Sequence, residues 1–205
     1  MESAERLLHD NVPEEYGGGG ADLPLAFRGA NVTPIFKNKG SEDCPGNYRT
    51  IFLLEVVGKA LFQLLNRRLE PLAESALWDC QNGFRANRGV NHSALCLKLL
   101  QQHAADVSAP LCVLFLDVKK AFDSIPRPLI MQALESIGVP YPLIRFYEQV
   151  HTDVICRIGG KGESFTMGRG VRQGSPEGPV LFALAYQLIL QQALANVPGN
   201  NHSNR

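Results

Sequence analysis

The sequence has no surplus of charge, since 20 lysines and arginines balance 20 aspartates and glutamates. Proteins that bind nucleic acid through its phosphates usually carry a basic excess, so the overall balance gives no indication of such a partner. The charges are nevertheless unevenly distributed. Residues 1–30 hold six of the acids and two of the bases, which leaves 14 acids and 18 bases in the remainder. This later surplus is compatible with a nucleic-acid groove.

Paired cysteines and membrane signals are also missing. The five cysteines are odd in number, widely spaced and never arranged as Cys-x-x-Cys. This pattern argues against a disulfide framework and a zinc ribbon, and it is typical of a reducing compartment. The sequence has neither a charged and then apolar leader nor an apolar run that we expect to be long enough to span a bilayer. We therefore expect an intracellular protein with no membrane partner.

The composition is that of an ordinary globular protein, with 45% hydrophobic and 20% charged residues among 205. A chain of this length buries one core, or a core and a small subdomain. The four glycines from Gly17 to Gly20 predict a flexible lead-in over residues 1–30. We expect the folded domain to span residues 31–190, followed by a helix end and a disordered tail over residues 191–205.

The spacing of apolar residues predicts a mixture of helices and strands. We expect a strand over residues 31–36 and a hairpin from Val154–Ile158 to Ser164–Met167, joined by a glycine turn. A helix is expected from residue 55 to about 68, with Pro71 beyond its end. Further helices are expected over residues 90–103, 128–138, 141–150 and 179–195.

The stretch from Leu111 to Ile125 combines an apolar run with an ionisable residue directly after it. Its first six residues, Leu111 to Leu116, are apolar without helical spacing and rich in strand formers, which predicts a strand buried on both faces. Asp117 follows as an ionisable group at the rim of a core. A carboxylate there is tolerated if it faces water, caps the next helix or holds a metal ion, so the residues alone leave these roles open.

Five segments occur in an order that resembles the reverse transcriptases of LINE-like (non-LTR) retroelements and of their group II intron relatives. They are Val32 to Lys37 with Asn47 to Ile51, Gln81 to Arg85, Leu111 to Ile125, Val154 to Gly160, and Gly170 to Pro176. The third segment contains the first carboxylate motif and the signature Lys-Ala-Phe-Asp. Each segment alone is weak evidence, whereas their collinear order over most of the stretch from Val32 to Leu190 is strong.

The resemblance implies an α+β protein with a partial right-hand polymerase fold, made of fingers and an incomplete palm. It also implies RNA-templated DNA synthesis from deoxynucleoside triphosphates, with an RNA template and a DNA primer as partners. The implied cofactor is Mg²⁺, or Mn²⁺ in its place, because nucleotidyl transfer uses two metal ions about 3.5–4 Å apart. In the family the first Asp of the carboxylate motif binds both ions, and this position is Asp117. The carbonyl of Val118 is expected to face the ion that holds the triphosphate.

Other positions match residues that contact the substrate in the family. Lys37 and Arg49 match the basic residues that hold the triphosphate, Arg49 by a forked contact and Lys37 by a point contact that Lys39 could also provide. Phe122 matches the aromatic residue that packs under the nucleotide sugar and excludes a 2′ hydroxyl. We expect these side chains to line one cleft with Asp117.

The second substrate motif of the family matches Gln173 and Gly174. There the Gln side chain touches the nucleotide sugar and base, and the Gly lets the backbone approach the template pair. Arg85 and Arg172 are expected to contact nucleic acid. Asp123 ends the Lys-Ala-Phe-Asp signature, but it lies six residues beyond Asp117. We therefore interpret Asp123 as structural.

The sequence departs from the family at three places. The usual Tyr-Arg-Pro-Ile-Ser reads Tyr-Arg-Thr-Ile-Phe at residues 48–52, and the usual Pro-Leu-Ser-Pro reads Pro-Glu-Gly-Pro at residues 176–179, where Glu177 is expected to bring negative charge near template phosphates. The aromatic-Ala-Asp-Asp turn does not occur, and the sequence contains no Asp-Asp pair. We therefore expect a truncated, inactive fragment without the C-terminal palm strands and the thumb. The alternative is a non-catalytic RNA-binding or degenerate element-derived protein.

Overall fold

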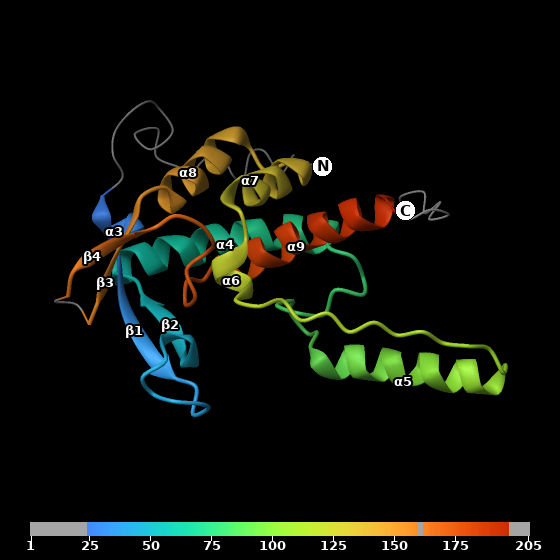
Figure 1. Cartoon of the computed structure of the whole chain (residues 1–205). Coiled ribbons are helices and arrows are strands. Elements are labelled where there is room, and N and C mark those ends of the chain that lie inside the picture. Colours follow the sequence, from blue (N-terminus) through green and yellow to red (C-terminus); the bar gives the residue numbers. More distant parts are fainter. Residues whose placement is uncertain (1–23, 160–161, 197–205) are drawn as a thin grey trace.

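The computed structural model describes residues 24–159 and 162–196 and has a mixed α+β fold (Figure 1), which confirms the predicted class. Most of the predicted lead-in and most of the predicted tail lie outside the described residues. Residues 24–30 of the lead-in are described, and they include helix α3 (Leu25–Arg28) and the first residue of the sheet, Ala30. Helix α3 contacts two later helices and a strand, so structure begins before the predicted boundary at residue 31.

A four-stranded sheet forms one side of the molecule, in the order β2-β1-β3-β4. Strands β1 (Ala30–Phe36) and β2 (Tyr48–Leu53) are antiparallel, β1 and β3 (Val154–Ile158) are parallel, and β3 and β4 (Ser164–Met167) are antiparallel. The predicted first strand and the predicted antiparallel pairing of the two hairpin strands are therefore confirmed, while residues 160–161 of the predicted glycine turn lie outside the described residues. One face of the sheet buries Val32, Phe52, Val154 and Cys156, and period-2 alternation leaves the other face exposed.

Four helices enclose the main core. They are α4 (Val56–Ala76), α7 (Arg127–Ser136), α8 (Tyr141–His151) and α9 (Gly178–Ala195). Helix α9 contacts α4 and α7, and α7 contacts α8 (Figure 1). The side chain of Gln187 on α9 fixes the end of α4, because it accepts a hydrogen bond from the backbone N–H of Trp78 at 2.7 Å and donates one to the carbonyl of Ala76 at 2.9 Å.

Helix α4 is longer than the sequence predicted. It continues through Pro71 to Ala76, eight residues beyond the expected end at about residue 68. A proline inside a helix costs about 3 kcal/mol, because it removes one backbone hydrogen bond and its ring crowds the preceding turn. Here Pro71 is exposed, while Leu65, Leu69 and Ala73 lie buried on the opposite face on both sides of it. Burial of this continuous apolar stripe offsets the cost.

Helix α9 is also more apolar than expected. By length and composition it could cross a membrane, with a mean hydropathy of 1.3 over 18 residues, so the expectation that no run is long enough was wrong. In this structure its residues Val180, Leu181, Leu184 and Ala185 are buried in the core formed with α4, α7 and α8. In this structure α9 therefore packs as a helix of the core.

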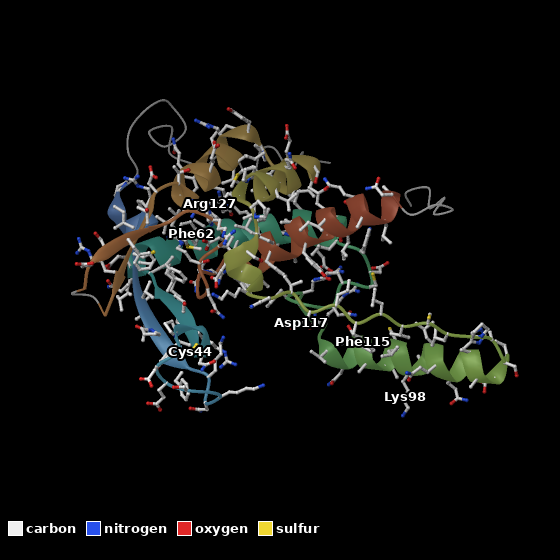
Figure 2. The ribbon with its side chains drawn as sticks, in the orientation of Figure 1. Cys44, Phe62, Lys98, Phe115, Asp117 and Arg127 are labelled. Atoms are coloured by element: carbon white, nitrogen blue, oxygen red, sulfur yellow. The ribbon has the colours of Figure 1, made fainter. Side chains whose placement is uncertain are left out.

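Helix α5 (Val90–Asp106) and the following residues 107–120 extend away from the body (Figure 1). We call residues 90–120 the arm. The predicted strand Leu111–Leu116 lies in the arm, and this prediction was wrong: these residues form no strand, and all six are exposed (Figure 2). An apolar run becomes a buried strand only if a neighbouring strand takes up its backbone hydrogen bonds. Within the described residues no strand lies beside it.

Candidate functional site

Residues 169–177, which precede α9, form a loop that we call the Gln173 loop. Its first part is attached to the short helix α6 (Ala121–Ser124) and the residue after it. The N–H of Gly170 donates to the carbonyl of Ile125, and the N–H of Val171 donates to the carbonyl of Phe122, both at 2.9 Å. Gly170 has φ +80°, and a Cβ there would lie 2.5 Å from the carbonyl oxygen of Phe122. Glycine is therefore required for this close approach.

The second part of the Gln173 loop is attached to the outer edge of β2. The N–H of Phe52 donates to the carbonyl of Gln173 at 2.8 Å, so the loop satisfies a backbone group that the edge strand would otherwise expose. Gly174 has φ +114°, and a Cβ there would lie 2.8 Å from the carbonyl oxygen of Phe52. The structure thus brings Gln173 and Gly174 to β2 at one end of the loop and Phe122 to the other.

The ring of Phe122 is half-buried in an aromatic cluster. It stacks on Phe182 of α9 with ring centres 5.2 Å apart and meets the edge of Phe84 at 5.9 Å. Phe182 in turn stacks on Tyr186 at 5.6 Å. Phe84 is 59% exposed, so the cluster extends from the core to the surface. The contact of Phe122 with a nucleotide sugar stays a prediction.

The two predicted triphosphate contacts lie on the β1–β2 hairpin. Arg49 on β2 is paired in register with Ile35 on β1, and both point to the exposed face of the sheet. Lys37 follows the end of β1, and its ammonium group donates to the carbonyl of Gly46 at 2.9 Å. The guanidinium of Arg49 has no ion-pair partner among the described residues, so it is available to an external anion. Arg49 lies on the strand to which the Gln173 loop is bonded.

Asp117 lies in the exposed segment of the arm where it approaches α6 (Figure 2). Its carboxylate forms no hydrogen bond or ion pair with another described residue, and Val118 beside it is also exposed. The predicted placement of Asp117 at the end of a central strand was wrong, since residues 107–116 directly before it form no strand. The structure keeps Asp117 four residues before α6, but it does not fix the carboxylate in a cleft.

Arg172 and Glu177 lie in the interior, although the sequence predicted a surface role for each of them. Both side chains are fully buried, with a guanidinium nitrogen of Arg172 3.3 Å from a carboxylate oxygen of Glu177. Arg172 also donates to the carbonyl of Phe27 at 2.9 Å, and its guanidinium lies 5.0 Å above the ring of Phe62. The expected contact of Arg172 with nucleic acid and the expected charge of Glu177 near template phosphates are both incompatible with this burial.

Other buried ionisable groups surround this ion pair. Burial raises the pKa of Glu177, while the attraction of Arg172 lowers it, and the net direction is upward. Burial lowers the pKa of His151 to about 3, with repulsion from Arg172 contributing, so the imidazole is neutral in the folded chain. Burial and the nearby Glu177 raise the pKa of Tyr147. In the sequence, the one feature that set this buried cluster apart was the unusual Pro-Glu-Gly-Pro at residues 176–179.

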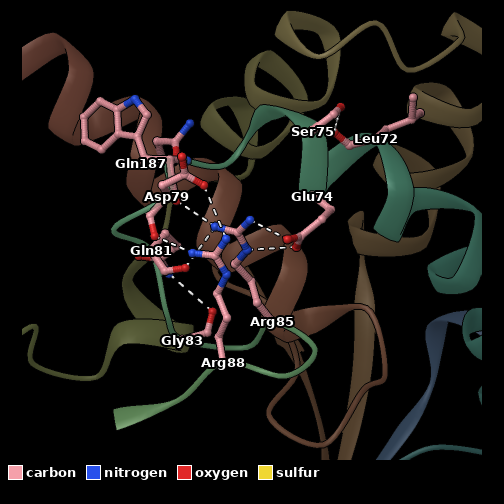
Figure 3. A network of polar contacts seen from close by, with 10 residues as sticks. Leu72, Glu74, Ser75, Asp79, Gln81, Gly83, Arg85, Arg88 and Gln187 are labelled. Carbon is pink, nitrogen blue, oxygen red and sulfur yellow. Dashed lines mark hydrogen bonds and ion pairs between the residues drawn. The ribbon is translucent and has the colours of Figure 1, made fainter. Parts of the chain in front are cut away.

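Arg85 is likewise occupied by the protein itself (Figure 3). Its guanidinium donates two hydrogen bonds to the carboxylate of Glu74, one from Nε at 2.8 Å and one from Nη2. It also donates to the carbonyls of Trp78 at 2.7 Å and Gln81 at 3.1 Å. Hydrogen bonding to Arg85 lowers the pKa of Glu74. The predicted nucleic-acid contact of Arg85 was therefore wrong for this structure. Its role is to fold the loop after α4.

A family model described as reverse transcriptase (RNA-dependent DNA polymerase) matches residues 35–203. The chain belongs to the reverse transcriptase family. This finding confirms the resemblance that the order of the motifs indicated. Enzymes of this family generally depend on divalent metal ions and use a nucleic acid template with nucleotide substrates.

Similar proteins come from non-LTR retrotransposons. The chain is 30% identical over 174 residues to the retrovirus-related Pol polyprotein of the type-2 retrotransposable element R2DM of Drosophila melanogaster, covering 83% of this chain and 16% of that polyprotein. It is 27% identical over 181 residues to an R2 element polyprotein of Popillia japonica, covering 86% of this chain and 25% of the relative. The chain thus spans a quarter or less of these relatives' length.

A solved structure supports the polymerase fold. Apo telomerase from Candida tropicalis, truncated from the C-terminal domain, has a TM-score of 0.58 and 15% sequence identity, with 91% of this chain and 43% of that chain covered. At this identity the likeness concerns the fold alone.

The residues of this reverse transcriptase chain fit one divalent ion better than two. Mg²⁺ is bound by one or two carboxylates, with water and phosphate oxygens as its other ligands. The unpaired carboxylate of Asp117 and the carbonyl of Val118 would suit one such ion. No group of three or more histidine, cysteine, aspartate or glutamate side chains that could hold a metal occurs within the described ranges. Within these ranges, therefore, at most two such side chains come together at any one place.

Proposed function

We propose that this chain is the nucleotide-contacting part of an RNA-directed DNA polymerase of a non-LTR retroelement. The observation that carries the proposal is the attachment of the Gln173 loop to both Phe122 and β2. Through this loop, residues from three distant segments of the sequence become neighbours. These segments contain Arg49, Phe122 and Gln173, which match residues that the family uses on the incoming nucleotide.

Each residue then has a chemical role that its position allows. Arg49 offers five N–H donors in a fixed fork that matches phosphate oxygens, and Lys37 adds a point charge. The ring of Phe122 would exclude a 2′ hydroxyl by contact with the sugar. Gln173 would hydrogen-bond the sugar and base, while Gly174 keeps that approach free of a side chain.

Asp117 and Val118 would hold Mg²⁺, or Mn²⁺ in its place. A bound ion would neutralise the triphosphate charge and orient it for attack by the primer 3′ oxygen. The exposed position of Asp117 leaves room for the water and phosphate ligands that Mg²⁺ prefers. We further propose that an RNA template, a DNA primer and deoxynucleoside triphosphates are the partners and that the protein acts inside the cell.

The alternative is a non-catalytic RNA-binding or degenerate element-derived protein. It is favoured by one observation, that no group of three or more potential metal-ligating side chains occurs within the described part of the chain. The two candidates differ in nucleotide binding. A protein that retained only a surface for RNA would not need the triphosphate contacts of Arg49.

The proposal predicts that replacing Arg49 by alanine weakens nucleotide binding by about 10-fold or more, because a hydrogen bond to a charged group is lost. The measurement is a fluorescence titration of the purified chain with a labelled deoxyadenosine triphosphate and Mg²⁺. Arg145→Ala is the matched control, since Arg145 pairs with Glu148 on the surface of α8. Equal affinities of the wild type and Arg49→Ala would contradict the proposal, and binding of RNA without nucleotide would favour the alternative.

A further inference from the structure

The buried ion pair of Arg172 and Glu177 has poor geometry for a pair that stabilises a fold. Both side chains are fully buried, and their charged atoms approach only to 3.3 Å. Within the described residues, Nε of Arg172 and Oε2 of Glu177 have no hydrogen-bond partner. A buried pair offsets the loss of hydration only when its geometry is good and its remaining polar atoms are satisfied. Stability therefore does not explain why two charges lie here.

Arg172 is fixed through both its side chain and its backbone. Its guanidinium donates to the carbonyl of Phe27 on α3 at 2.9 Å and lies 5.0 Å above the ring of Phe62 on α4. Its carbonyl accepts hydrogen bonds from the hydroxyl of Ser175 at 3.0 Å and from the N–H of Ser175 at 3.2 Å. Gln173 follows Arg172 directly, so one neighbour of Gln173 is anchored in the core.

The other side of Gln173 is fixed by strand β2. The carbonyl of Gln173 accepts the N–H of Phe52 at 2.8 Å, and Gly174 lies so close that a Cβ there would meet the Phe52 carbonyl oxygen at 2.8 Å. The side chain of Gln173 is half-buried between these two attachments. Its direction therefore depends on a backbone that Arg172 holds from one side and β2 from the other.

We propose that Arg172 and Glu177 are positioning residues that hold the side chain of Gln173 in the direction in which it meets a nucleotide, an inference that rests on the proposed function. Each buried charge must face the other, whereas apolar side chains of similar size can pack in several ways. Violations of the usual rules for buried polar groups are typical of functional sites. At position 177 the family usually has leucine, so the pair is a feature of this chain.

The first test uses Arg172→Met with Glu177→Leu, a double variant that removes both charges at similar volume. We expect its urea midpoint to stay close to that of the wild type, while its affinity for labelled deoxyadenosine triphosphate with Mg²⁺ falls about 3–10-fold, the value of one hydrogen bond. Unchanged affinity in the double variant overturns the proposal, because the pair would then have no effect on the nucleotide.

A double-mutant cycle with Gln173→Ala shows whether the loss passes through Gln173. Gln173→Ala is expected to weaken binding by the wild type and to cause no further loss in the double variant, where Gln173 is already misplaced. Arg49→Ala is the matched control, since it should cost the same factor in both backgrounds. An equal effect of Gln173→Ala in both backgrounds would show that the pair acts elsewhere and would overturn the proposal.

These results also separate the proposal from the function on which it rests. If Arg49→Ala leaves the affinity of the wild type unchanged, the proposed function fails and the positioning role fails with it. If binding depends on Arg49 but not on the ion pair, only the positioning role fails.

A second measurement needs no variant and therefore does not depend on how the double variant folds. Backbone ¹⁵N relaxation of the wild type should give Gln173 an order parameter close to 0.85, about the value of a rigid backbone. A value nearer the flexible range below about 0.6 would show that the ion pair does not fix Gln173 and would overturn the proposal.

Discussion

Replacing Glu177 by glutamine is expected to lower the free energy of unfolding by about 3–5 kcal/mol. The change leaves the guanidinium of Arg172 buried without its counter-charge, and its remaining described partners are the Phe27 carbonyl and the Phe62 ring. An uncompensated charge in the interior costs several kcal/mol. Urea unfolding of the wild type and of Glu177→Gln measures the difference, provided that the slope with denaturant is unchanged.

The double variant Arg172→Met with Glu177→Leu is the matched control. It removes both charges and fills a similar volume, so its stability is expected to be close to that of the wild type or higher. A large loss in the double variant would mean that the hydrogen bond from Arg172 to the Phe27 carbonyl, and not charge balance, holds the loop. A loss below about 1 kcal/mol in Glu177→Gln, within the range of a surface pair, would show that the pair is not buried in solution.

The helices and the hairpin could be predicted because their signals are local. Helices α5, α7, α8 and α9 begin and end within a few residues of the expected bounds, since apolar spacing, prolines and glycines act over short distances. Helix α4 was predicted too short, because the penalty of Pro71 is local whereas the burial that offsets it is tertiary.

The segment Leu111–Leu116 could not be predicted in the same way. Its composition specifies a strand, but a strand also needs a partner, and composition does not say where the partner lies. The order of the motifs identified the family although this strand is not formed here. The order of the motifs therefore indicates the family, whereas it does not establish that the strand Leu111–Leu116 forms.

The interior position of Arg172 depends on residues distant in sequence. Its hydrogen bond to Phe27 joins positions 145 residues apart. A charged residue in a glycine-rich loop normally faces solvent, whereas Arg172 is buried and contacts Phe27 of α3 and Phe62 of α4. The position of Arg85 likewise depends on a residue outside its own loop, because its carboxylate partner Glu74 lies on α4.

The 205-residue chain by itself is expected to add no nucleotides to a primer on an RNA template, with either Mg²⁺ or Mn²⁺. Two-metal transfer needs carboxylates from more than one segment, because one Asp cannot neutralise and position two cations against a triphosphate. No group of three or more potential metal-ligating side chains occurs within residues 24–159 and 162–196, and the sequence contains no Asp-Asp pair. The measurement is a primer-extension assay with a labelled DNA primer.

Asp117→Ala is the control in that assay. Extension by the wild-type chain that disappears in Asp117→Ala would show that a second carboxylate takes part, and the prediction would be wrong. Extension that both proteins show equally would instead indicate a contaminating polymerase.

The central claim is that Arg49, Asp117, Phe122 and Gln173 surround one nucleotide. The most direct measurement is NMR of the labelled chain with deoxythymidine triphosphate and Mn²⁺, which broadens amide signals close to the ion. We predict that the signals of Val118, Phe122, Gln173 and Gly174 broaden together and that Asp117→Ala abolishes the effect. Broadening centred on another part of the chain, or unchanged in Asp117→Ala, would contradict the claim.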